Sequence, residues 1–214
     1  MRLLRRIAVL AVLTTAPATP ALGQPSRAPA ASSEPAWSWG ISGAWYMPSD
    51  DSNFVQPTVT ADRSSLHLET RYAYEDRKSL SFFAGRHFEF GNTATLTLTP
   101  MIGGLVGHVD GVIPALELDF GVWRIEAYGE AEYVFDLHDS SSQFFYMWSE
   151  LSLRPTDWLR AGVATQRTRV YHTERDVQRG PLVGLSFSKV DATLYLFNLG
   201  ERDRLAVLSV GLSF

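Results

Sequence analysis

The stretch that most constrains this chain is VWRIEAYGEAEYVFD, residues 122–136, in which polar and apolar side chains alternate. Successive side chains of a β-strand point to opposite faces, so the stretch predicts one long strand with two unlike faces. The polar face carries Arg124, Glu126, Tyr128, Glu130, Glu132 and Asp136. The other face carries Trp123, Ile125, Ala127, Gly129, Ala131, Tyr133 and Phe135.

Three properties of this strand favour a membrane barrel over a water-soluble sandwich. It runs about fifteen residues, whereas ordinary strands have roughly five or six and a tilted membrane crossing needs nine to eleven. Full charges stand in mid-strand, where the inner face of a sandwich requires apolar residues. Aromatic residues flank smaller ones on the apolar face, as expected where rings lie at both membrane–water interfaces.

The same alternation recurs along the chain and predicts twelve strands. They span residues 37–46, 53–60, 65–75, 79–90, 93–106, 112–120, 122–136, 143–154, 157–171, 181–188, 191–198 and 204–214. The second is the weakest because it contains Pro57, so ten strands is the main alternative; an up-and-down bacterial barrel needs an even number. The predicted fold is therefore an all-β, transmembrane, antiparallel up-and-down barrel over residues 36–214.

The predicted connections differ in length on the two sides of the barrel. Short turns are expected at 61–63, 91–92, 121–122, 155–157 and 190–191, and longer loops at 47–52, 137–142, 172–180 and 199–203. Short periplasmic turns and longer extracellular loops are typical of outer-membrane barrels. A turn at 121–122 sets Asp119 opposite Arg124 and Glu117 opposite Glu126.

The amino terminus predicts export. Three arginines (Arg2, Arg5, Arg6) precede the apolar run IAVLAVL and the small-residue stretch ALG at 21–23, the pattern of a signal peptide cleaved near Gly23. The apolar run is too short to span a bilayer. Residues 24–35, rich in Pro, Ala and Ser, are expected to form a flexible leader.

Composition excludes several function classes. The chain has 19 basic and 23 acidic residues, which argues against a nucleic-acid partner. It has no cysteine, so disulfides, thiolate metal sites and a cysteine nucleophile are excluded. Five histidines are present, but none lies at a recognised metal-ligand spacing from another, His67 and His87 included. We expect no metal and no cofactor.

The carboxy-terminal segment LAVLSVGLSF, residues 205–214, ends on an aromatic residue. Phe214 is followed back along one face by Leu212, Val210, Leu208 and Ala206. With this ending and its strand pattern, the chain resembles bacterial outer-membrane β-barrels, including small uncharacterised ones. The resemblance covers residues 37–214. It implies location in the bacterial outer membrane, contact with its lipids, and recognition of Phe214, Leu212, Val210 and Leu208 by the barrel-assembly machinery.

The polar faces of the predicted strands place charged side chains inside the barrel. The lumen-lining set is Glu69, Arg71, Glu117, Asp119, Arg124, Glu126, Glu130, Glu132, Glu150, Arg154 and Arg160. Seven acids against four bases predict a porin-like, non-enzymatic channel for passive diffusion of small hydrophilic solutes, with a mild preference for cations. The alternative is a structural or adhesive barrel whose lumen is plugged by the same charges, because twelve strands fall between filled and open barrels.

A third possibility is a lipid hydrolase. His138, Asp139 and Ser140 resemble the His-x-Ser arrangement of outer-membrane phospholipases and lipid A deacylases, in which histidine activates serine at the membrane surface. In those families the pair faces lipid, whereas the parity of residues 124–136 places His138 and Ser140 on the lumen side or in a loop. The surrounding DSSSQ is also an ordinary polar loop sequence.

Two arginines fall on the lipid-facing side of the strand at 157–171. Arg167 and Arg169 continue the row of Leu159, Ala161, Val163 and Thr165. A charge costs about 2–4 kcal/mol at the bilayer midplane but almost nothing near the interface. We expect both near the outer rim, binding phosphates of lipopolysaccharide, unless a β-bulge turns them into the lumen.

Overall fold

The computed structural model describes residues 36–170 and 176–214. The predicted signal peptide (1–23) and leader (24–35) lie outside the described residues. The strands are β1 (Ser38–Pro48), β2 (Phe54–Arg63), β3 (Leu66–Tyr72), β4 (Ser79–Arg86), β5 (Phe88–Phe90), β6 (Ala94–Gly107), β7 (Gly111–Val122), β8 (Ile125–Asp136), β9 (Phe144–Thr156), β10 (Leu159–Val170), β11 (Asp176–Phe187), β12 (Val190–Phe197) and β13 (Leu205–Ser213). A short 3₁₀ turn, η2 (Ser140–Ser142), lies between β8 and β9.

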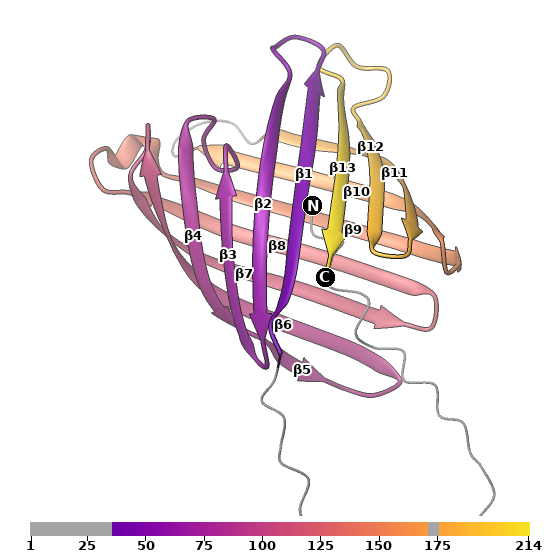
Figure 1. The fold of residues 1–214 in the computed structure, drawn as a ribbon. Helices are drawn as coiled ribbons and strands as arrows, with labels where there is room; N and C mark the ends of the chain where they lie inside the picture. Colours follow the sequence, from indigo (N-terminus) through magenta and orange to yellow (C-terminus); the bar gives the residue numbers. More distant parts are fainter. Residues whose placement is uncertain (1–35, 171–175) are drawn as a thin grey trace, which may run out of the picture.

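The strands close into a barrel because the first and last are neighbours (Figure 1). Every pairing is antiparallel, and β1 pairs with β13 from Gly40↔Ser213 to Pro48↔Leu205. Trp39 and Phe214 extend this seam by exchanging both backbone hydrogen bonds, at 2.8 and 3.0 Å. Closure satisfies backbone groups that would otherwise be exposed along two sheet edges, which a membrane requires.

The barrel has twelve strand positions around its wall, as predicted, and we call each position a stave. Thirteen strand segments are present in the described residues, because one stave consists of two segments. Segments β4 and β5 both pair with β6 in one register, shown by Gly85↔Met101 and Phe88↔Leu98, so they are two parts of one stave interrupted at His87. Pro57 is accommodated in β2 because β3 pairs with β2 only from Thr58 onward. Proline is tolerated where a strand lacks one of its two neighbours.

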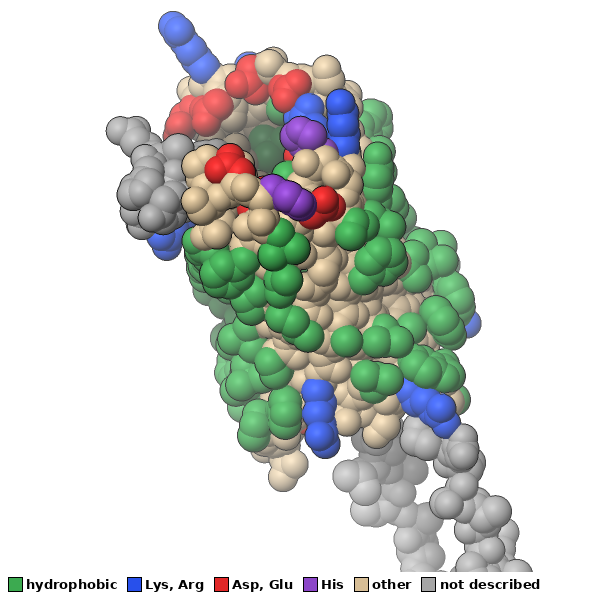
Figure 2. All heavy atoms as spheres, turned by 90° about the vertical axis from the view of Figure 1, so that its left-hand side faces the viewer, with side chains coloured by type: hydrophobic (Ala, Val, Ile, Leu, Met, Phe, Trp, Pro, Cys, Tyr) green, Lys and Arg blue, Asp and Glu red, His purple; other side chains and the backbone are tan. Residues whose placement is uncertain are grey.

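The two faces of the barrel differ as the alternation predicts. Exposed outward positions along the strands are mostly apolar, such as Ile41, Phe82, Ile102, Leu151 and Val183, while charged side chains of the same strands are buried inside. Figure 2 shows hydrophobic side chains over the wall, acidic and histidine side chains at the upper end, and Lys and Arg side chains at both ends. Across residues 36–170 and 176–214, no helix is long and apolar enough to cross a membrane.

The two ends of the barrel have connections of different length. We call the end with the short connections, such as Ser64–Ser65, Trp123–Arg124 and Ser188–Lys189, the turn end. The opposite end, with residues 49–53, 73–78, 137–143 and 198–204, is the loop end. Exposed aromatic residues surround the turn end: Trp37, Trp39, Phe88, Phe90, Trp123, Trp158, Phe187 and Phe214. Such a girdle is typical of a membrane–water interface.

Several predicted turn positions are wrong by one to three residues. Val122 pairs with Ile125, so the turn between β7 and β8 is Trp123–Arg124 rather than 121–122. Residues 61–63, 155–156 and 190–191 also belong to strands. The physical reason is that turn residues Ser64, Trp123 and Ser188 adopt positive φ values of 52–57° without being glycine, so the sequence lacks the usual turn signal.

The displaced turn changes the charge pairing that we predicted between β7 and β8. Glu117 lies opposite Glu130 and not Glu126, and Asp119 lies opposite Tyr128 and not Arg124. The parity of each residue is unchanged, because the hairpin moved by an even number of positions. The displaced turn therefore changes the level at which each charge meets its neighbours and not the face of the strand to which it belongs.

Candidate functional site in the barrel interior

The centre of the barrel holds one guanidinium among five carboxylates. Arg71 Nη1 lies 2.7 Å from Glu130, 3.0 Å from Glu132 and 3.6 Å from Glu75. Arg71 Nη2 lies 3.8 Å from Glu117, and Arg71 Nε donates a short hydrogen bond to Glu69. All six side chains have an exposed fraction of 0%. We call these six residues the acidic cluster.

The cluster spans the lumen because its members come from separate parts of the wall. Strand β3 supplies Glu69 and Arg71, while β7 supplies Glu117, and β8 supplies Glu130 and Glu132. The strand order places β4 and β6 between β3 and β7, so Arg71 reaches across the interior rather than along the sheet. Its guanidinium also lies 4.3 Å from the ring centroid of Tyr74 and 4.5 Å from that of Phe83.

Glu75 is a member of the cluster that sequence reasoning missed. It follows β3 at the loop end, where its side chain turns inward and accepts a hydrogen bond from Ser81 at 2.9 Å. The predicted strand at 65–75 includes Glu75, and its parity matches that of Glu69 and Arg71, so the alternation was the signal that could have placed it in the lumen.

A second interior group is a fully hydrogen-bonded carboxylate. Glu150 on β9 pairs with Arg160 Nη1 at 2.7 Å and accepts from Tyr195 Oη at 2.8 Å and Trp148 Nε1 at 2.9 Å. Arg160 also donates to Thr193 at 3.2 Å. One carboxylate meets one guanidinium here, whereas five carboxylates share one guanidinium in the acidic cluster, so we interpret this group as structural support for the wall.

The remaining charges of the predicted set lie near the turn end. Arg154 pairs with Glu126 at 3.0 Å, and both side chains are about one-fifth exposed. Arg124 lies in the turn itself and donates to the backbone oxygens of Arg154 and Pro155 at 2.9 and 2.7 Å. Asp119 is half-buried on β7. Of the eleven predicted residues, these four therefore occupy one mouth rather than the middle of the lumen.

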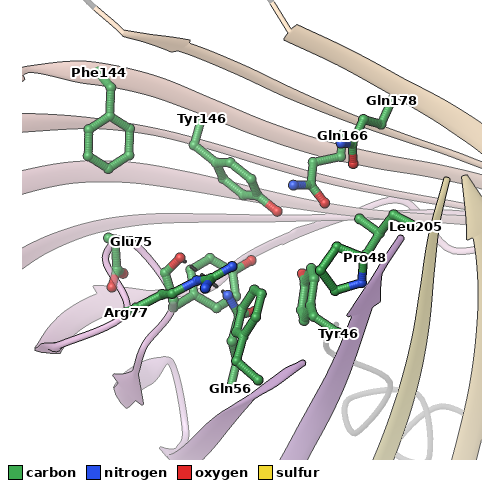
Figure 3. A pocket seen from close by; sticks show the side chains of 12 residues that line it. Tyr46, Pro48, Gln56, Glu75, Arg77, Phe144, Tyr146, Gln166, Gln178 and Leu205 are labelled. Carbon is green, nitrogen blue, oxygen red and sulfur yellow. Dashed lines mark hydrogen bonds between the residues drawn. The ribbon is translucent and has the colours of Figure 1, made fainter. Parts of the chain in front are cut away.

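A polar cavity of about 220 Å³ opens at the loop end. Figure 3 shows Tyr146, Gln166 and Gln178 on one side of it and Tyr46 and Gln56 on the other. The side-chain oxygens of Gln56, Gln166 and Gln178 are buried without a hydrogen-bond partner among the described residues. Such groups bind water or a polar solute, because leaving them unsatisfied is costly. Glu75 and Arg77 also line this cavity.

Two histidines that are far apart in the sequence meet near the turn end. The rings of His67 and His87 are 5.2 Å apart, and both contact Asp62. The separation of twenty positions between them matches no recognised ligand motif, and the hairpin geometry alone brings them together.

The structure places the His138–Asp139–Ser140 triplet in the loop between β8 and β9. The Asp139 carboxylate accepts hydrogen bonds from the hydroxyls of Ser141 and Ser142, at 2.7 and 3.0 Å, and not from His138. The bonds from Ser141 hold the pKa of Asp139 below its usual range. His138 and Ser140 are exposed. Asp139 here caps η2, which is the ordinary role of aspartate at a helix start.

Arg167 lies on the outward face of β10. Its ladder partners are Met147 and Val177, both exposed outward, and its guanidinium lies 5.6 Å from the ring centroid of Phe145. The ladders are regular from Ala161 onward, and the one irregularity lies between Leu159 and Ala161. Arg169 pairs with Phe145 in the ladder, but its side chain lies outside the described residues. Their binding to lipopolysaccharide remains a prediction.

Comparison with solved structures identifies barrels of similar architecture. Two structures of the KdgM porin, one in complex with disordered oligogalacturonate, match with TM-scores of 0.60 and 0.61. Each is 11% identical and covers 82% of this chain and 99% of the porin. The outer membrane protein Omp33 of Acinetobacter baumannii is 11% identical over 83% of this chain and 98% of its own, with a TM-score of 0.45. No protein-family model and no curated protein matches the sequence.

Proposed function

We propose that this chain, which has the porin-like fold of an outer-membrane β-barrel, is a channel for small hydrophilic solutes that favours cations and neutral molecules. We place it in the bacterial outer membrane with its turn end toward the periplasm. The apolar outer wall and the aromatic girdle of the turn end support this placement. The predicted signal peptide provides the route of export.

The observation that carries the proposal is the ratio of one guanidinium to five carboxylates in the acidic cluster. Burying carboxylates in excess of cations costs several kcal/mol per ion in a dry interior. Water and cations that enter the lumen lower this cost, whereas a barrel built only to be solid gains nothing from extra buried acids. A wet, acidic lumen attracts cations and repels anions.

Passage requires the acidic cluster to rearrange. Its side chains have no exposed area, so the lumen is closed at this level by Arg71 and the glutamates around it. Exposed side chains change rotamer on fast timescales, and we expect the buried cluster to gain this freedom when water enters from the loop-end cavity of about 220 Å³, which adjoins Glu75. We infer that movement of the Arg71 side chain opens a narrow path.

The acidic lumen also bears on which solutes pass. The KdgM porin was solved in complex with oligogalacturonate, a polyanion. The fold is shared, but five carboxylates at the constriction of this chain disfavour a polyanion by direct charge repulsion. We therefore expect small cations and neutral polar molecules, and not acidic oligosaccharides, to be its solutes.

The test is single-channel recording on refolded mature protein in a planar bilayer with a salt gradient. We expect discrete conductance and a reversal potential of the sign for cation preference. Glu117→Gln with Glu130→Gln, which face each other across β7 and β8, should move the reversal potential toward anions. Asp50→Asn with Glu201→Gln removes equal charge from exposed loop-end positions and should change it little, because salt screens exposed charges.

The alternative of a structural barrel with a plugged lumen has one observation in its favour. The acidic cluster and the Glu150–Arg160 pair are both fully packed, with exposed fractions of at most 4%. This alternative predicts no conductance from correctly folded protein, even when Arg71 is replaced by a smaller residue. Absence of conductance in both wild type and Arg71→Ser would overturn the channel proposal and favour the structural barrel.

A further inference from the structure

We propose that Asp62, His67 and His87 bind a divalent transition-metal ion of the zinc class inside the turn end of the barrel. His67 Nδ1 lies 2.6 Å and His87 Nε2 lies 2.9 Å from the same Asp62 oxygen, Oδ1. The three ligand atoms all lie within 4.8 Å of one another. Imidazole with carboxylate is a donor set that suits zinc, cobalt, nickel and copper.

The fold holds the three residues on adjacent staves. Asp62 and His67 are direct ladder partners across the tight hairpin between β2 and β3. His87 is the residue that interrupts the next stave between β4 and β5, and its backbone nitrogen donates to Ser65 of the same hairpin at 2.8 Å. The ladder fixes the backbones of Asp62 and His67, and the bond to Ser65 holds that of His87, so the donors are arranged before any ion arrives.

To coordinate an ion, the three ligand atoms, which lie within 4.8 Å of one another, have to take up nearly equal spacings. With metal–nitrogen and metal–oxygen distances of about 2.0–2.1 Å, ligand atoms of a tetrahedral site stand about 3.3 Å apart. The Asp62 oxygen would therefore withdraw by a few tenths of an ångström from each ring (from 2.6 and 2.9 Å). Its side chain is 22% exposed, so it has room to do so.

The outer contacts of both rings are those of a ligating histidine. His67 directs its other nitrogen, Nε2, to the Glu69 carboxylate at 3.2 Å, and His87 directs Nδ1 to the Thr99 hydroxyl at 2.9 Å. Metal-ligating histidines nearly always present the second ring nitrogen to a carboxylate or another hydrogen-bonding oxygen, which fixes the tautomer that leaves the ligating nitrogen unprotonated. This double arrangement is an observation independent of the three-residue cluster.

The site is reachable from one side. His67 is fully buried, whereas the His87 side chain is 12% exposed, and it lies with Asp62 near the turn end. An ion therefore enters from the turn-end mouth and keeps at least one coordination position for water, the arrangement of sites with three protein ligands. The proposal does not depend on conduction through the lumen.

The test is Co²⁺ titration of untagged mature protein, refolded in detergent, followed by visible d–d absorption and displacement with Zn²⁺. We expect one equivalent to bind. His67→Gln, His87→Gln and Asp62→Asn should each weaken binding at least tenfold, and loss of the outer contact in Thr99→Ala should weaken it about tenfold. His108→Gln is the matched control, because His108 also faces a carboxylate, Asp76 at 3.2 Å, but has no second histidine in its group.

Each outcome decides the question. Failure of folded wild type to bind one equivalent of Co²⁺ or Zn²⁺ overturns the proposal, as does unchanged affinity in both His87→Gln and Asp62→Asn. Loss of binding in His108→Gln alone would show that the ion binds at the loop end, and this result also overturns the proposal. Heat-modifiable migration on gels shows whether each variant is folded. If a histidine variant does not fold, the near-isosteric Asp62→Asn replaces it in the binding test. Because conductance is not measured, failure here leaves the channel proposal intact.

Discussion

Replacement of Arg71 by methionine isolates the contribution of the single guanidinium in the acidic cluster. Methionine replaces the aliphatic stem of arginine and carries no charge, so the space of the guanidinium over Tyr74 and Phe83 is left open and no carboxylate is neutralised. Five carboxylates, which all lie within 4 Å of the guanidinium in the wild type, would then face one another. Removing one partner of a buried ion pair costs about 3–5 kcal/mol because the other charge stays buried.

That range is the expected loss in free energy of unfolding for Arg71→Met. Two features of the structure bear on its size. The cluster has several carboxylates and not one, which raises the cost, while water that enters the space left by the guanidinium lowers it. Loss of the two cation–π contacts, at 4.3 and 4.5 Å, adds a smaller amount, roughly 0.5–2 kcal/mol each. We therefore expect Arg71→Met to lower the free energy of unfolding by about 3 kcal/mol or more.

The assay is urea-induced unfolding in lipid vesicles, followed by the fluorescence of the six tryptophans. Arg77→Met is the matched control, because Arg77 pairs with Asp51 at 2.6 Å but both side chains are about half exposed, and exposed pairs contribute little. The defect of Arg71→Met should shrink as the pH falls to about 4, where carboxylates take up protons.

Equal stability of Arg71→Met and wild type at neutral pH would refute this reasoning. It would mean that the cluster is already hydrated enough to tolerate its charge without the arginine. A defect that does not shrink on acidification would show that lost packing, and not uncompensated charge, causes the destabilisation.

Three further predictions concern assembly, lipid contact and export. Phe214→Asp, which places a charge at the seam beside Trp39, should lower the amount of barrel in the outer membrane, as measured by fractionation; levels equal to wild type would contradict it. Arg167→Gln with Arg169→Gln should lower barrel stability in bilayers containing lipopolysaccharide but not in detergent, and equal losses would mean that the arginines serve the lumen. The mature protein should begin near Gln24, which amino-terminal sequencing of the outer-membrane fraction tests; an intact Met1 would exclude cleavage.

The sequence predicts the barrel well because alternation is a local property. A residue such as Glu130 has its face set by its parity with Arg124 in the same strand, and no knowledge of other strands is needed. Closure into twelve staves followed from counting such segments and from the requirement for an even number. Even Pro57, which argued against one strand, lies just outside the part of β2 that pairs with β3.

Contacts across the lumen could not be predicted in the same way. They depend on register between strands, and register depends on turns whose residues, such as Trp123 with a φ of 52°, carry no glycine signal. A turn shifted from 121–122 to Trp123–Arg124 brings Glu117 to Glu130 rather than Glu126. The pairing of Asp62 with His67 could not be predicted for the same reason. A turn at 61–63 places Asp62 in the connection, whereas the structure places it in the ladder.

The proposed metal site and the acidic cluster share one carboxylate, and this gives a final prediction. Glu69 accepts from His67 Nε2 at 3.2 Å through one oxygen and from Arg71 Nε through the other. A dication on His67 Nδ1 makes Nε2–H a stronger donor and draws the Glu69 charge away from Arg71. Because both proposals together place this link in the conducting path, Zn²⁺ added on the turn-end side should change the single-channel conductance of wild type but not of His87→Gln. An equal response of both proteins, or a response from the loop-end side alone, would show that zinc acts elsewhere.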